Sequence, residues 1–315
     1  MKKSNEKSLF KRATEHLQFL LQSHHLQGKK IIIALSGGAD SIFLGMLLST
    51  EIPAELLLAA HFDHQLRNSS KEDELFCKTW AKEKNIRFFS ERWNTPKNTE
   101  EAARNARREF LFSIAKQENV SSIALGTHAN DNVETIFHHF LRGTGAKGLS
   151  GISEFDEKTT LFRPLLPFWK IEILSFLAQE KIPFCEDETN ASSEYTRNFL
   201  RNDVFPLLRT RFPEYENNIL RQAEVFRRQH YFCEQSAKKF LEKQEEKISR
   251  KEFSQLPEAV QTEIVRFLFA PGNIDFAQTE SLREFFLTGK SGKKMILGDT
   301  QFSTFSEYIF WEKSS

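Results

Sequence analysis

Near the N-terminus, the stretch KIIIALSGGADS from Lys30 to Ser41 places two glycines, two hydroxyls and a carboxylate directly after an apolar run. Glycines at such a turn let the backbone approach a bulky phosphate, and the first N–H groups of a following helix attract an anion. Asp40 would repel a phosphate unless a cation lay between them, and a carboxylate with phosphate oxygens is a typical Mg²⁺ site. The stretch therefore predicts a nucleotide site with Mg²⁺ on Asp40. The alternative is a plain turn in which Asp40 and Ser41 cap the helix.

A second candidate site lies between Gly126 and Ile152, in the stretch GTHANDNVETIFHHFLRGTGAKGLSGI. Asp131 and Glu134 are three residues apart at the start of a predicted helix, so their carboxylates share one face. Two carboxylates beside a phosphate site suit Mg²⁺ binding or base catalysis, although an isolated acidic pair more commonly just stabilises a helix N-terminus. The glycine-rich end of the stretch, with Arg142 and Lys147, is typical of a loop that approaches phosphate or closes over a site.

Two weaker signals lie elsewhere in the first half of the chain. The stretch HFDHQLR, from His61 to Arg67, has two histidines and an aspartate at the end of a predicted strand, but a structural loop explains it about equally well. Arg104 and Arg108 lie one turn apart on a predicted helix and could grip phosphates, whereas a solvated helix face is the simpler explanation. These residues become candidates only together with the two stronger sites.

The elements that would hold these residues alternate between strand and helix. Apolar and β-branched runs predict the strands, and helical spacing of apolar residues predicts the helices between them. The strands are expected at residues 31–35, 56–64, 86–91 and 121–126, and the helices at 8–28, 70–84, 99–119 and within 127–141. This alternation predicts an α/β fold, a parallel sheet with helices on both faces. Because ligands bind at the carboxyl ends of parallel strands, the candidate stretches are expected to converge there.

A domain boundary is predicted near Pro206 and Pro213, which interrupt the helical pattern. The expected division is a catalytic domain at 1–212 and a smaller, mainly helical domain at 213–315. The second domain is expected to contain helices at 216–246, 259–269 and 279–288 and a last strand at 306–313. Arginines, Arg227 and Arg228 among them, are interleaved with aromatic residues on the long helix. That pattern suits an RNA backbone, although a helix that packs its aromatic side inward is the commoner case.

The whole chain has 315 residues, 39% of them hydrophobic, and a formal net charge of +1 at pH 7. A charge near zero excludes a global field that would draw the protein onto nucleic acid, so such a partner would need a local basic patch. The three cysteines, Cys77, Cys185 and Cys233, form no C-x-x-C motif and no disulfide framework. No apolar run is long enough for a membrane span and the N-terminus has no signal-peptide pattern, so we expect a cytoplasmic protein.

Several of these motifs resemble those of known families. SGGADS matches the SGGxDS signature of the PP-loop ATP pyrophosphatases. With HFDHQLR, EEAARNARREF, RGTGAKGLSGI and TRNFLRN, in order and spacing from about residue 30 to 228, the chain resembles the tRNA(Ile)-lysidine synthetase family. The resemblance implies a fold of the PP-loop, adenine nucleotide α hydrolase-like type and the activity of an ATP-dependent ligase.

By this resemblance, the protein would use ATP and Mg²⁺ to adenylate the wobble cytidine of the isoleucine tRNA with a CAU anticodon, and would release pyrophosphate. Free lysine would then displace AMP to give lysidine, and the protein could act as a homodimer. Two rival functions stay open. A PP-loop tRNA thiolase would use paired cysteines, which the spacing here does not offer. A non-catalytic RNA-binding module would not need carboxylates gathered at strand ends.

The resemblance also implies roles for individual residues. The catalytic set is Asp40, Asp131, Glu134 and Arg197, with Arg197 preferred over Arg201 as the arginine that faces the site, and the metal ligands are Asp40 and Asp131. The ATP-binding set is Ser36, Gly37, Gly38, Ala39, Asp40, Ser41, His61, Arg108, Gly126 and His128. The tRNA-binding set is Arg142, Lys147, Arg201, Arg227 and Arg228. The chain departs from the family pattern at Asn130, where Asp is usual, and at Asn132, where Gln is usual.

Overall fold

The chain divides into two compact units, each with its own core. The first unit comprises Met1–Thr144 and Gly151–Arg221, and the second comprises Gly145–Ser150 and Gln222–Ser315. The computed structural model describes residues 8–63, 70–93, 100–185, 196–244, 247–269 and 274–313. The division into a catalytic domain up to residue 212 and a tRNA-contacting domain after it remains a prediction.

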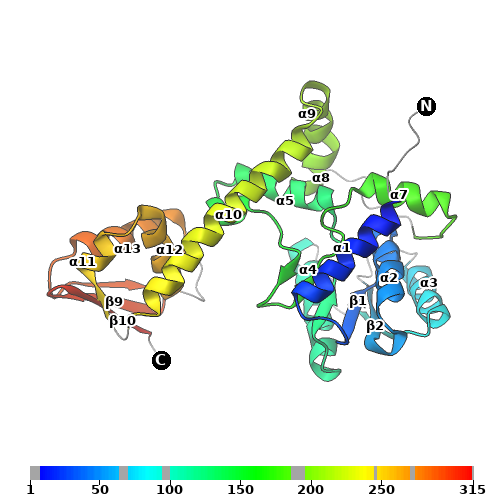
Figure 1. Ribbon diagram of the computed structural model, residues 1–315, viewed down its shortest axis with the longest axis horizontal. Helices are drawn as coiled ribbons and strands as arrows, with labels where there is room; N and C mark the ends of the chain where they lie inside the picture. The colour runs from blue at the N-terminus through cyan, green and yellow to red at the C-terminus, as the bar shows by residue number, and fades with distance from the viewer. Residues whose placement is uncertain are drawn as a thin grey trace. The chain divides into compact units, whose positions relative to one another are not determined.

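A six-stranded sheet forms the centre of the first unit (Figure 1). Its strands are β1 (Ile31–Ala34), β2 (Leu57–Asp63), β3 (Arg87–Arg92), β4 (Ser122–Ala124), β5 (Phe155–Asp156) and β6 (Leu161–Phe162). The strand order is β3-β2-β1-β4-β6-β5, and every pairing is parallel except that of β5 with β6. The predicted parallel sheet is therefore confirmed. The order reverses between β1 and β4, and such a switch point is where open α/β sheets bind ligands.

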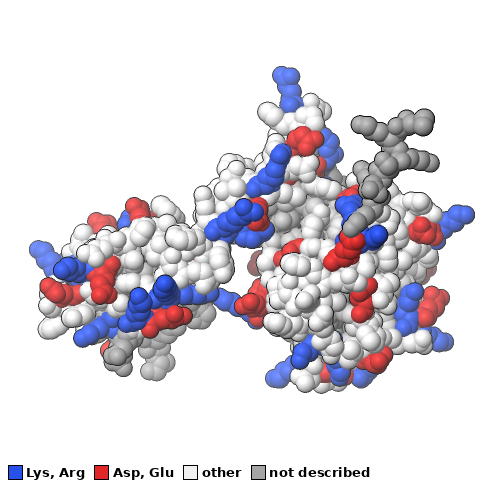
Figure 2. All heavy atoms as spheres, in the orientation of Figure 1, with Lys and Arg blue, Asp and Glu red and all other residues white. Residues whose placement is uncertain are grey.

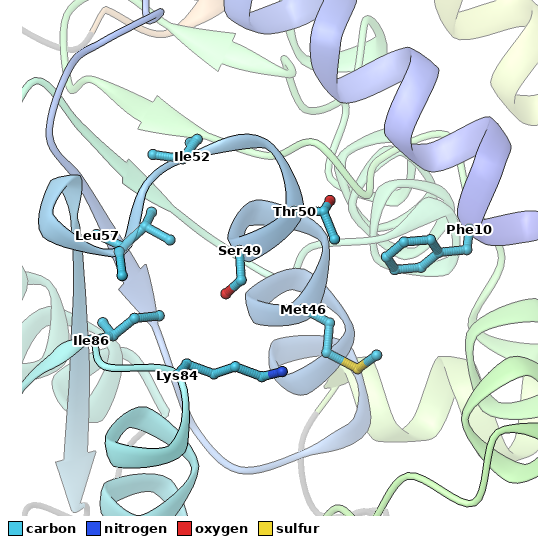
Figure 3. A pocket seen from close by; sticks show the side chains of 9 residues that line it. Phe10, Met46, Ser49, Thr50, Ile52, Leu57, Lys84 and Ile86 are labelled. Atoms are coloured by element: carbon cyan, nitrogen blue, oxygen red, sulfur yellow. The ribbon is translucent and has the colours of Figure 1, made fainter.

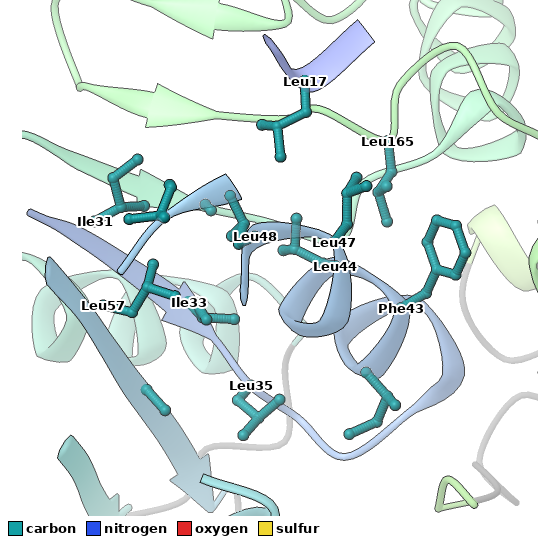
Figure 4. Packing of buried hydrophobic residues seen from close by; sticks show 14 of the residues in the cluster. Leu17, Ile31, Ile33, Leu35, Phe43, Leu44, Leu47, Leu48, Leu57 and Leu165 are labelled. Atoms are coloured by element: carbon teal, nitrogen blue, oxygen red, sulfur yellow. The ribbon is translucent and has the colours of Figure 1, made fainter. Parts of the chain in front are cut away.

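Helices cover both faces of this sheet because the side chains of β1 alternate in direction. Ile31 and Ile33 pack into one cluster with residues of α1, α2, α3 and α7 (Figure 4). Ile32 packs on the opposite face with residues of α4. These helices are α1 (Leu9–Ser23), α2 (Ala39–Glu51), α3 (Ser70–Glu83), α4 (Glu100–Gln117) and α7 (Lys170–Gln179). All three isoleucines are fully buried, and each contributes about 2 kcal/mol of hydrophobic stabilisation. This burial fixes the strand that ends at the glycine turn.

The first helix is shorter than the sequence predicts. It ends at Ser23 rather than at residue 28, because His25 adopts a positive φ of 53° and the chain turns back there. The N–H of Leu26 donates to the carbonyl of Leu21, so the apolar pattern continues through a turn instead of a helix. Gly28, also at positive φ, lies in the connection to β1 rather than at the helix end.

The last part of the first unit packs against α5 (Ala129–Leu141), the helix that follows β4. It consists of α8 (Thr196–Phe199), a π-helical turn η3 (Leu200–Val204), α9 (Phe205–Arg211) and the start of α10 (Tyr215–Leu241). Leu200, Phe205 and Tyr215 are buried in one cluster with Val133 of α5. A segment from the far end of the unit is thereby held beside the loop after β4. The long helix α10 ends at Leu241 rather than near residue 246.

The second unit combines helices with a small antiparallel sheet. Besides the remainder of α10 and α6 (Ala146–Leu149), its helices are α11 (Arg250–Ser254), α12 (Glu258–Phe269) and α13 (Phe276–Thr288). Its strands, in spatial order, are β7 (Lys247–Ser249), β10 (Tyr308–Lys313), β9 (Thr300–Phe305) and β8 (Lys294–Leu297). The predicted helical character is confirmed, and the sheet adds three strands to the one that the sequence predicts. Among the described residues, no helix is long and apolar enough to cross a membrane.

Candidate active site

The glycine turn after β1 carries the first candidate site. Gly37 is buried and adopts a φ of +88°, which an L side chain rarely tolerates. Gly38 is the N-cap of α2, so no side-chain oxygen of the N-cap occupies the first turn. The Ser41 hydroxyl donates to the carbonyl of Gly38 at 2.9 Å and lies 3.2 Å from both the backbone N and the Oγ of Ser36. The two predicted serines therefore hold the turn in shape at a helix N-terminus that attracts anions.

The loop after β4 lies directly against this turn. A Cβ atom on Gly126 would lie 3.1 Å from the backbone carbon of Asp40 and 3.2 Å from the nitrogen of Ser41. Only glycine leaves enough room for this approach without a shift of one backbone against the other. The two strongest sequence signals are thus brought together at the switch point of the sheet.

His128 links the two loops. It is the N-cap of α5, where its ring Nδ1 accepts from the backbone N–H of Asp131 at 3.4 Å. The backbone N–H of His128 in turn donates to Oδ2 of Asp131 at 3.0 Å. The ring is buried, and its Nε2 lies 3.6 Å from Oδ2 of Asp40. When the ring is neutral, acceptance at Nδ1 leaves the proton on Nε2, facing Asp40. His128 thus lies between the two carboxylates predicted as metal ligands, with its ring Nε2 facing Asp40 and its backbone N–H bonded to Asp131.

The two carboxylate oxygens of Asp40 have different surroundings. Its Oδ2 lies 3.6 Å from His128 and 3.5 Å from Nζ of Lys170, the first residue of α7. Its Oδ1 is buried and has no hydrogen-bond partner within the described part of the chain. A buried carboxylate oxygen without a donor calls for a cation or a ligand, because leaving it unpaired is costly. Lys170 was not predicted from the sequence, since its approach to Asp40 depends on tertiary structure.

An ion pair with a buried carboxylate completes the group of charges. Glu134 is 4% exposed, and its two carboxylate oxygens each accept a 2.8 Å hydrogen bond from Arg201. These bonds, followed by the charges of Glu134, Asp131 and Asp40, raise the pKa of the Arg201 guanidinium against the opposing effect of burial. Arg201 therefore lies within electrostatic reach of all three predicted carboxylates. The side chain of Arg197, the arginine preferred from the sequence, lies outside the described residues.

The residues at the two departures from the family pattern both make hydrogen bonds that hold the backbone. Asn130 accepts from the N–H of Lys170 at 3.1 Å and donates to Glu216 at 3.4 Å. Asn132 is buried and accepts from the N–H of Ile152 at 2.8 Å. Asn130 thus joins the start of α5 to the start of α7, and Asn132 holds the end of the glycine-rich stretch.

Two more residues of the predicted ATP-binding set lie on β2 and α4. His61 is buried at the carboxyl half of β2, and its Nδ1 lies 3.0 Å from the carbonyl oxygen of Leu35, just before the glycine turn. Arg108 is exposed on α4 with its guanidinium 5.3 Å from the ring centre of Phe112. Arg108 and Arg104 also contribute to lowering the pKa of Arg163, for which burial is the larger cause. His61 therefore contacts the backbone just before the glycine turn. Arg108 belongs to a group of neighbouring arginines.

The residues predicted to bind tRNA occupy both units. In the first unit, Arg142 is the exposed C-cap of α5. In the second unit, Lys147 lies on α6, and the guanidinium of Arg227 donates to the carbonyl of Ser150 at 2.8 Å. Arg227 and Arg228 are exposed on α10, and both form ion pairs with Glu224. Figure 2 shows basic and acidic side chains interspersed on the visible face, which agrees with a net charge near zero.

A separate cavity of about 210 Å³ opens in the first unit (Figure 3). Its lining residues are Phe10, Met46, Ser49, Thr50, Ile52, Ala54, Leu57, Lys84 and Ile86. Leu57 begins β2 and Ile86 directly precedes β3, so the cavity lies at the amino ends of these strands. Ligands of parallel sheets bind at the opposite, carboxyl ends, where Asp40 and His128 lie. The cavity is therefore not part of the candidate active site.

The chain matches a family model and is similar to several known proteins. A family model described as a PP-loop domain matches residues 9–208. A tRNA(Ile)-lysidine synthase of Pseudothermotoga lettingae is 34% identical over 244 residues, which cover 73% of this chain and 53% of that protein. A tRNA(Ile)-lysidine synthase of Thermotoga maritima is 35% identical over 226 residues, which cover 69% of this chain and 54% of that protein. The chain spans about half the length of these relatives.

Among solved structures, the chain is similar to a U34-tRNA thiolase of Methanococcus maripaludis that was determined with its 4Fe–4S cluster. The TM-score is 0.56 at 16% identity, and the match covers 68% of this chain and 77% of the thiolase. At this level of identity the likeness concerns the fold alone.

Proposed function

Because the chain belongs to the PP-loop domain family, we propose that it is an ATP-dependent tRNA(Ile)-lysidine synthase. The observation that carries the proposal is the buried, unpartnered Oδ1 of Asp40 at the N-terminus of α2, beside His128 and Lys170. The names of the relatives support the choice of reaction. The reaction joins lysine to the wobble cytidine of the CAU isoleucine tRNA through an adenylated intermediate and yields lysidine, AMP and pyrophosphate.

ATP would bind with its phosphates at the glycine turn. The N-terminus of α2, which follows Gly37 directly, offers backbone N–H groups with partial positive charge. The ammonium of Lys170, 3.5 Å from Asp40, adds a full positive charge at the same place. These groups favour the negative charge that gathers on the β and γ phosphates as pyrophosphate leaves.

The donor set also fits Mg²⁺. Asp40 offers an unsatisfied carboxylate oxygen, and Asp131 offers a second carboxylate on the other side of the His128 ring. Mg²⁺ typically takes one or two carboxylates and completes its shell with phosphate oxygens and water. When bound, Mg²⁺ would neutralise charge on the departing pyrophosphate.

Glu134, Arg201 and Asp131 would act in the adenylation step and in the attack of lysine. Both oxygens of Glu134 are occupied by Arg201, so Glu134 would position that guanidinium to stabilise charge on the α-phosphate. Asp131 is more exposed than Glu134, with a side-chain exposure of 33% against 6%, and would hold the lysine ammonium or take its proton. The cytidine O2 would attack the α-phosphorus as pyrophosphate leaves, and the ε-amine of lysine would then displace AMP.

Exposed basic residues of both units would bind the tRNA. Arg142, Lys147, Arg227 and Arg228 would contact the RNA backbone, since exposed guanidinium and ammonium groups neutralise phosphates. We expect the enzyme to work in the cytoplasm, where tRNA is modified, and to form a homodimer that light scattering would detect.

The deciding experiment supplies the protein with ATP, Mg²⁺, labelled lysine and a transcript of the CAU isoleucine tRNA. The methionine tRNA, which also has a CAU anticodon, serves as the control. We expect lysine to enter only the isoleucine tRNA. Pyrophosphate release beyond the first turnover should require both tRNA and lysine, because lysine must displace AMP before the enzyme can act again. Sustained pyrophosphate release with tRNA but independent of lysine would favour a thiolase instead, and no release at all would leave an RNA-binding module.

A further inference from the structure

Two cysteines that are far apart in the sequence lie against the same glycine of the phosphate turn. A Cβ atom on Gly37 would lie 3.0 Å from Sγ of Cys185 and 3.3 Å from Sγ of Cys77. Since both sulfurs lie so close to one point, they are within about 6 Å of each other, and a movement of a few ångströms would bring them to bonding distance. A side chain on residue 37 would crowd both sulfurs, so the glycine allows them to lie against the turn.

Each cysteine is attached to a different element. Cys77 lies on α3 and is fully buried, with its Sγ 3.7 Å from the carbonyl oxygen of Leu35, the residue directly after β1. Cys185 lies in the segment after α7 and is partly exposed, and its N–H donates to the carbonyl of Gly37 at 2.9 Å. Both are thiols in this structure. The pair thus brackets the phosphate turn, with one member hydrogen-bonded to it.

We propose that Cys77 and Cys185 are a redox modification site, whose reversible disulfide closes beside Gly37 and weakens the binding of nucleotide phosphates. The disulfide itself stands on the placement of the two sulfurs. Its effect on ATP rests on the proposed function, because it assumes that the glycine turn binds ATP.

The chemistry requires an oxidant, which we take to be a hydroperoxide. Burial, followed by the charges of Cys185, Asp73 and Glu74, raises the pKa of the Cys77 thiol, so Cys77 stays protonated. The more exposed Cys185 would attack the peroxide as a thiolate: an S–O bond forms, the O–O bond breaks and hydroxide, or an alkoxide, leaves. Sulfur of Cys77 then attacks the sulfenic sulfur of Cys185, an S–S bond forms, and the displaced hydroxide takes the thiol proton and leaves as water.

The coupling to ATP follows from the hydrogen bond between Cys185 and Gly37. A disulfide needs its sulfurs about 2.05 Å apart, so one or both cysteines must move toward the other. Movement of Cys185 carries the N–H that holds the Gly37 carbonyl, and so changes the turn whose backbone faces the phosphates. By reciprocity, bound ATP would oppose formation of the disulfide as strongly as the disulfide opposes ATP.

The test begins with the full chain, reduced and then exposed to hydrogen peroxide, followed by peptide mapping without reductant. We expect a cross-linked pair of peptides containing Cys77 and Cys185, lighter by two hydrogens and restored by dithiothreitol. Cys233→Ser is the matched control and should form the same cross-link, whereas Cys185→Ser and Cys77→Ala should not. Stable sulfenic or sulfinic acid on Cys185 without a cross-link, or a cross-link to Cys233, would overturn the site.

The second arm measures Mg·ATP affinity by calorimetry on reduced and oxidised protein. We expect oxidation to weaken binding roughly tenfold, a usual size for coupling between two sites, and Cys185→Ser to be insensitive to peroxide. In glutathione buffers of fixed ratio, saturating Mg·ATP should lower the fraction of disulfide. Equal affinities in the two states would overturn the coupling. Failure of the reduced protein to bind ATP would contradict the proposed function, while the peptide map would still decide the disulfide.

Discussion

The Nε2 atom of His128 lies 3.6 Å from Oδ2 of Asp40, and this contact joins the loop after β1 to the loop after β4. The two loops are neighbours because β1 pairs in parallel with β4 at the point where the strand order reverses. Two sequence motifs whose residues Asp40 and His128 are 88 positions apart therefore form one site through the topology of the sheet. Each prediction below concerns one part of that arrangement.

Gly126 is expected to be essential to the approach of the two loops. In Gly126→Ala, the added Cβ would meet the backbone of Asp40 at 3.1 Å, and backbone cannot swing aside as a side chain can. We expect a loss of about 1–3 kcal/mol in the free energy of unfolding of the first unit, as for other overpacked sites. Gly145→Ala is the matched control, because its nearest neighbour would be a flexible arginine tip at 3.6 Å. Urea denaturation of the two variants measures the difference, and equal stability would contradict the packing argument.

In the ion pair of Glu134 and Arg201, loss of the arginine is expected to destabilise the protein more than loss of the carboxylate charge. The side chain of Glu134 is 6% exposed and that of Arg201 is 37% exposed, so only the carboxylate would be stranded away from water. Arg201→Met should therefore cost about 3 kcal/mol, as expected for a buried charge without its partner. Glu134→Gln should cost about 1 kcal/mol, since water can still reach Arg201. Chemical denaturation decides the order, and a larger loss in Glu134→Gln would be inconsistent with it.

Lys170 is expected to act on nucleotide binding rather than on folding. It is 40% exposed at the start of α7, and its ammonium lies 3.5 Å from Asp40. Lys170→Met should raise the Kd for Mg·ATP roughly tenfold, the effect of about 1.4 kcal/mol of lost charge interaction. Lys170→Arg, which keeps the charge, should lose less, and the melting temperature should hardly change in either variant. An unchanged Kd in Lys170→Met would remove this residue from the site.

In the second unit, Glu263 gives a pH-dependent prediction. Burial raises the pKa of its carboxyl, but hydrogen bonds and charges of His230 and Arg266 lower it by more, so the pKa falls below its ordinary value of 4.5. A lowered pKa stabilises the folded state above pH 4.5, and this contribution is lost as the pH falls through the lowered value. Glu263→Gln should cost about 1 kcal/mol at neutral pH. Hydrogen exchange in α12 measures the free energy of opening, and the difference between Glu263→Gln and wild type should become smaller below pH 4.5. A difference that does not change with pH would argue against a lowered pKa for Glu263.

Much of the fold could be predicted because its signals are local. The apolar run of β1, the glycine turn and the start of α2 are adjacent in the sequence, so strand, turn and helix follow from short-range patterns. The end of α1 was mispredicted because His25, not a glycine, takes the positive φ that turns the chain. The sheet of the second unit was largely missed, because its strands are short and only their pairing shows their faces.

The site could be predicted in its parts but not in its contacts. Asp40, His128 and Asp131 came from motifs, and the structure brings them together. The approach of Lys170 to Asp40, the pairing of Glu134 with Arg201 and the meeting of two cysteines at Gly37 depend on how distant segments pack. Sequence spacing carries no information about such meetings, so the lack of a C-x-x-C motif gave no sign that Cys77 and Cys185 lie against the same glycine.

The most direct test of the central claim is a calorimetric titration of Mg·ATP into wild type and into Asp40→Asn. The amide keeps the size of the carboxylate but removes the charge that the buried Oδ1 offers to a cation. We expect wild type to bind only when Mg²⁺ is present, and the variant to lose at least about 100-fold in affinity, the upper range for groups around a metal. Equal binding by the two proteins, or binding unaffected by removal of Mg²⁺, would contradict a metal-bridged nucleotide at the N-terminus of α2.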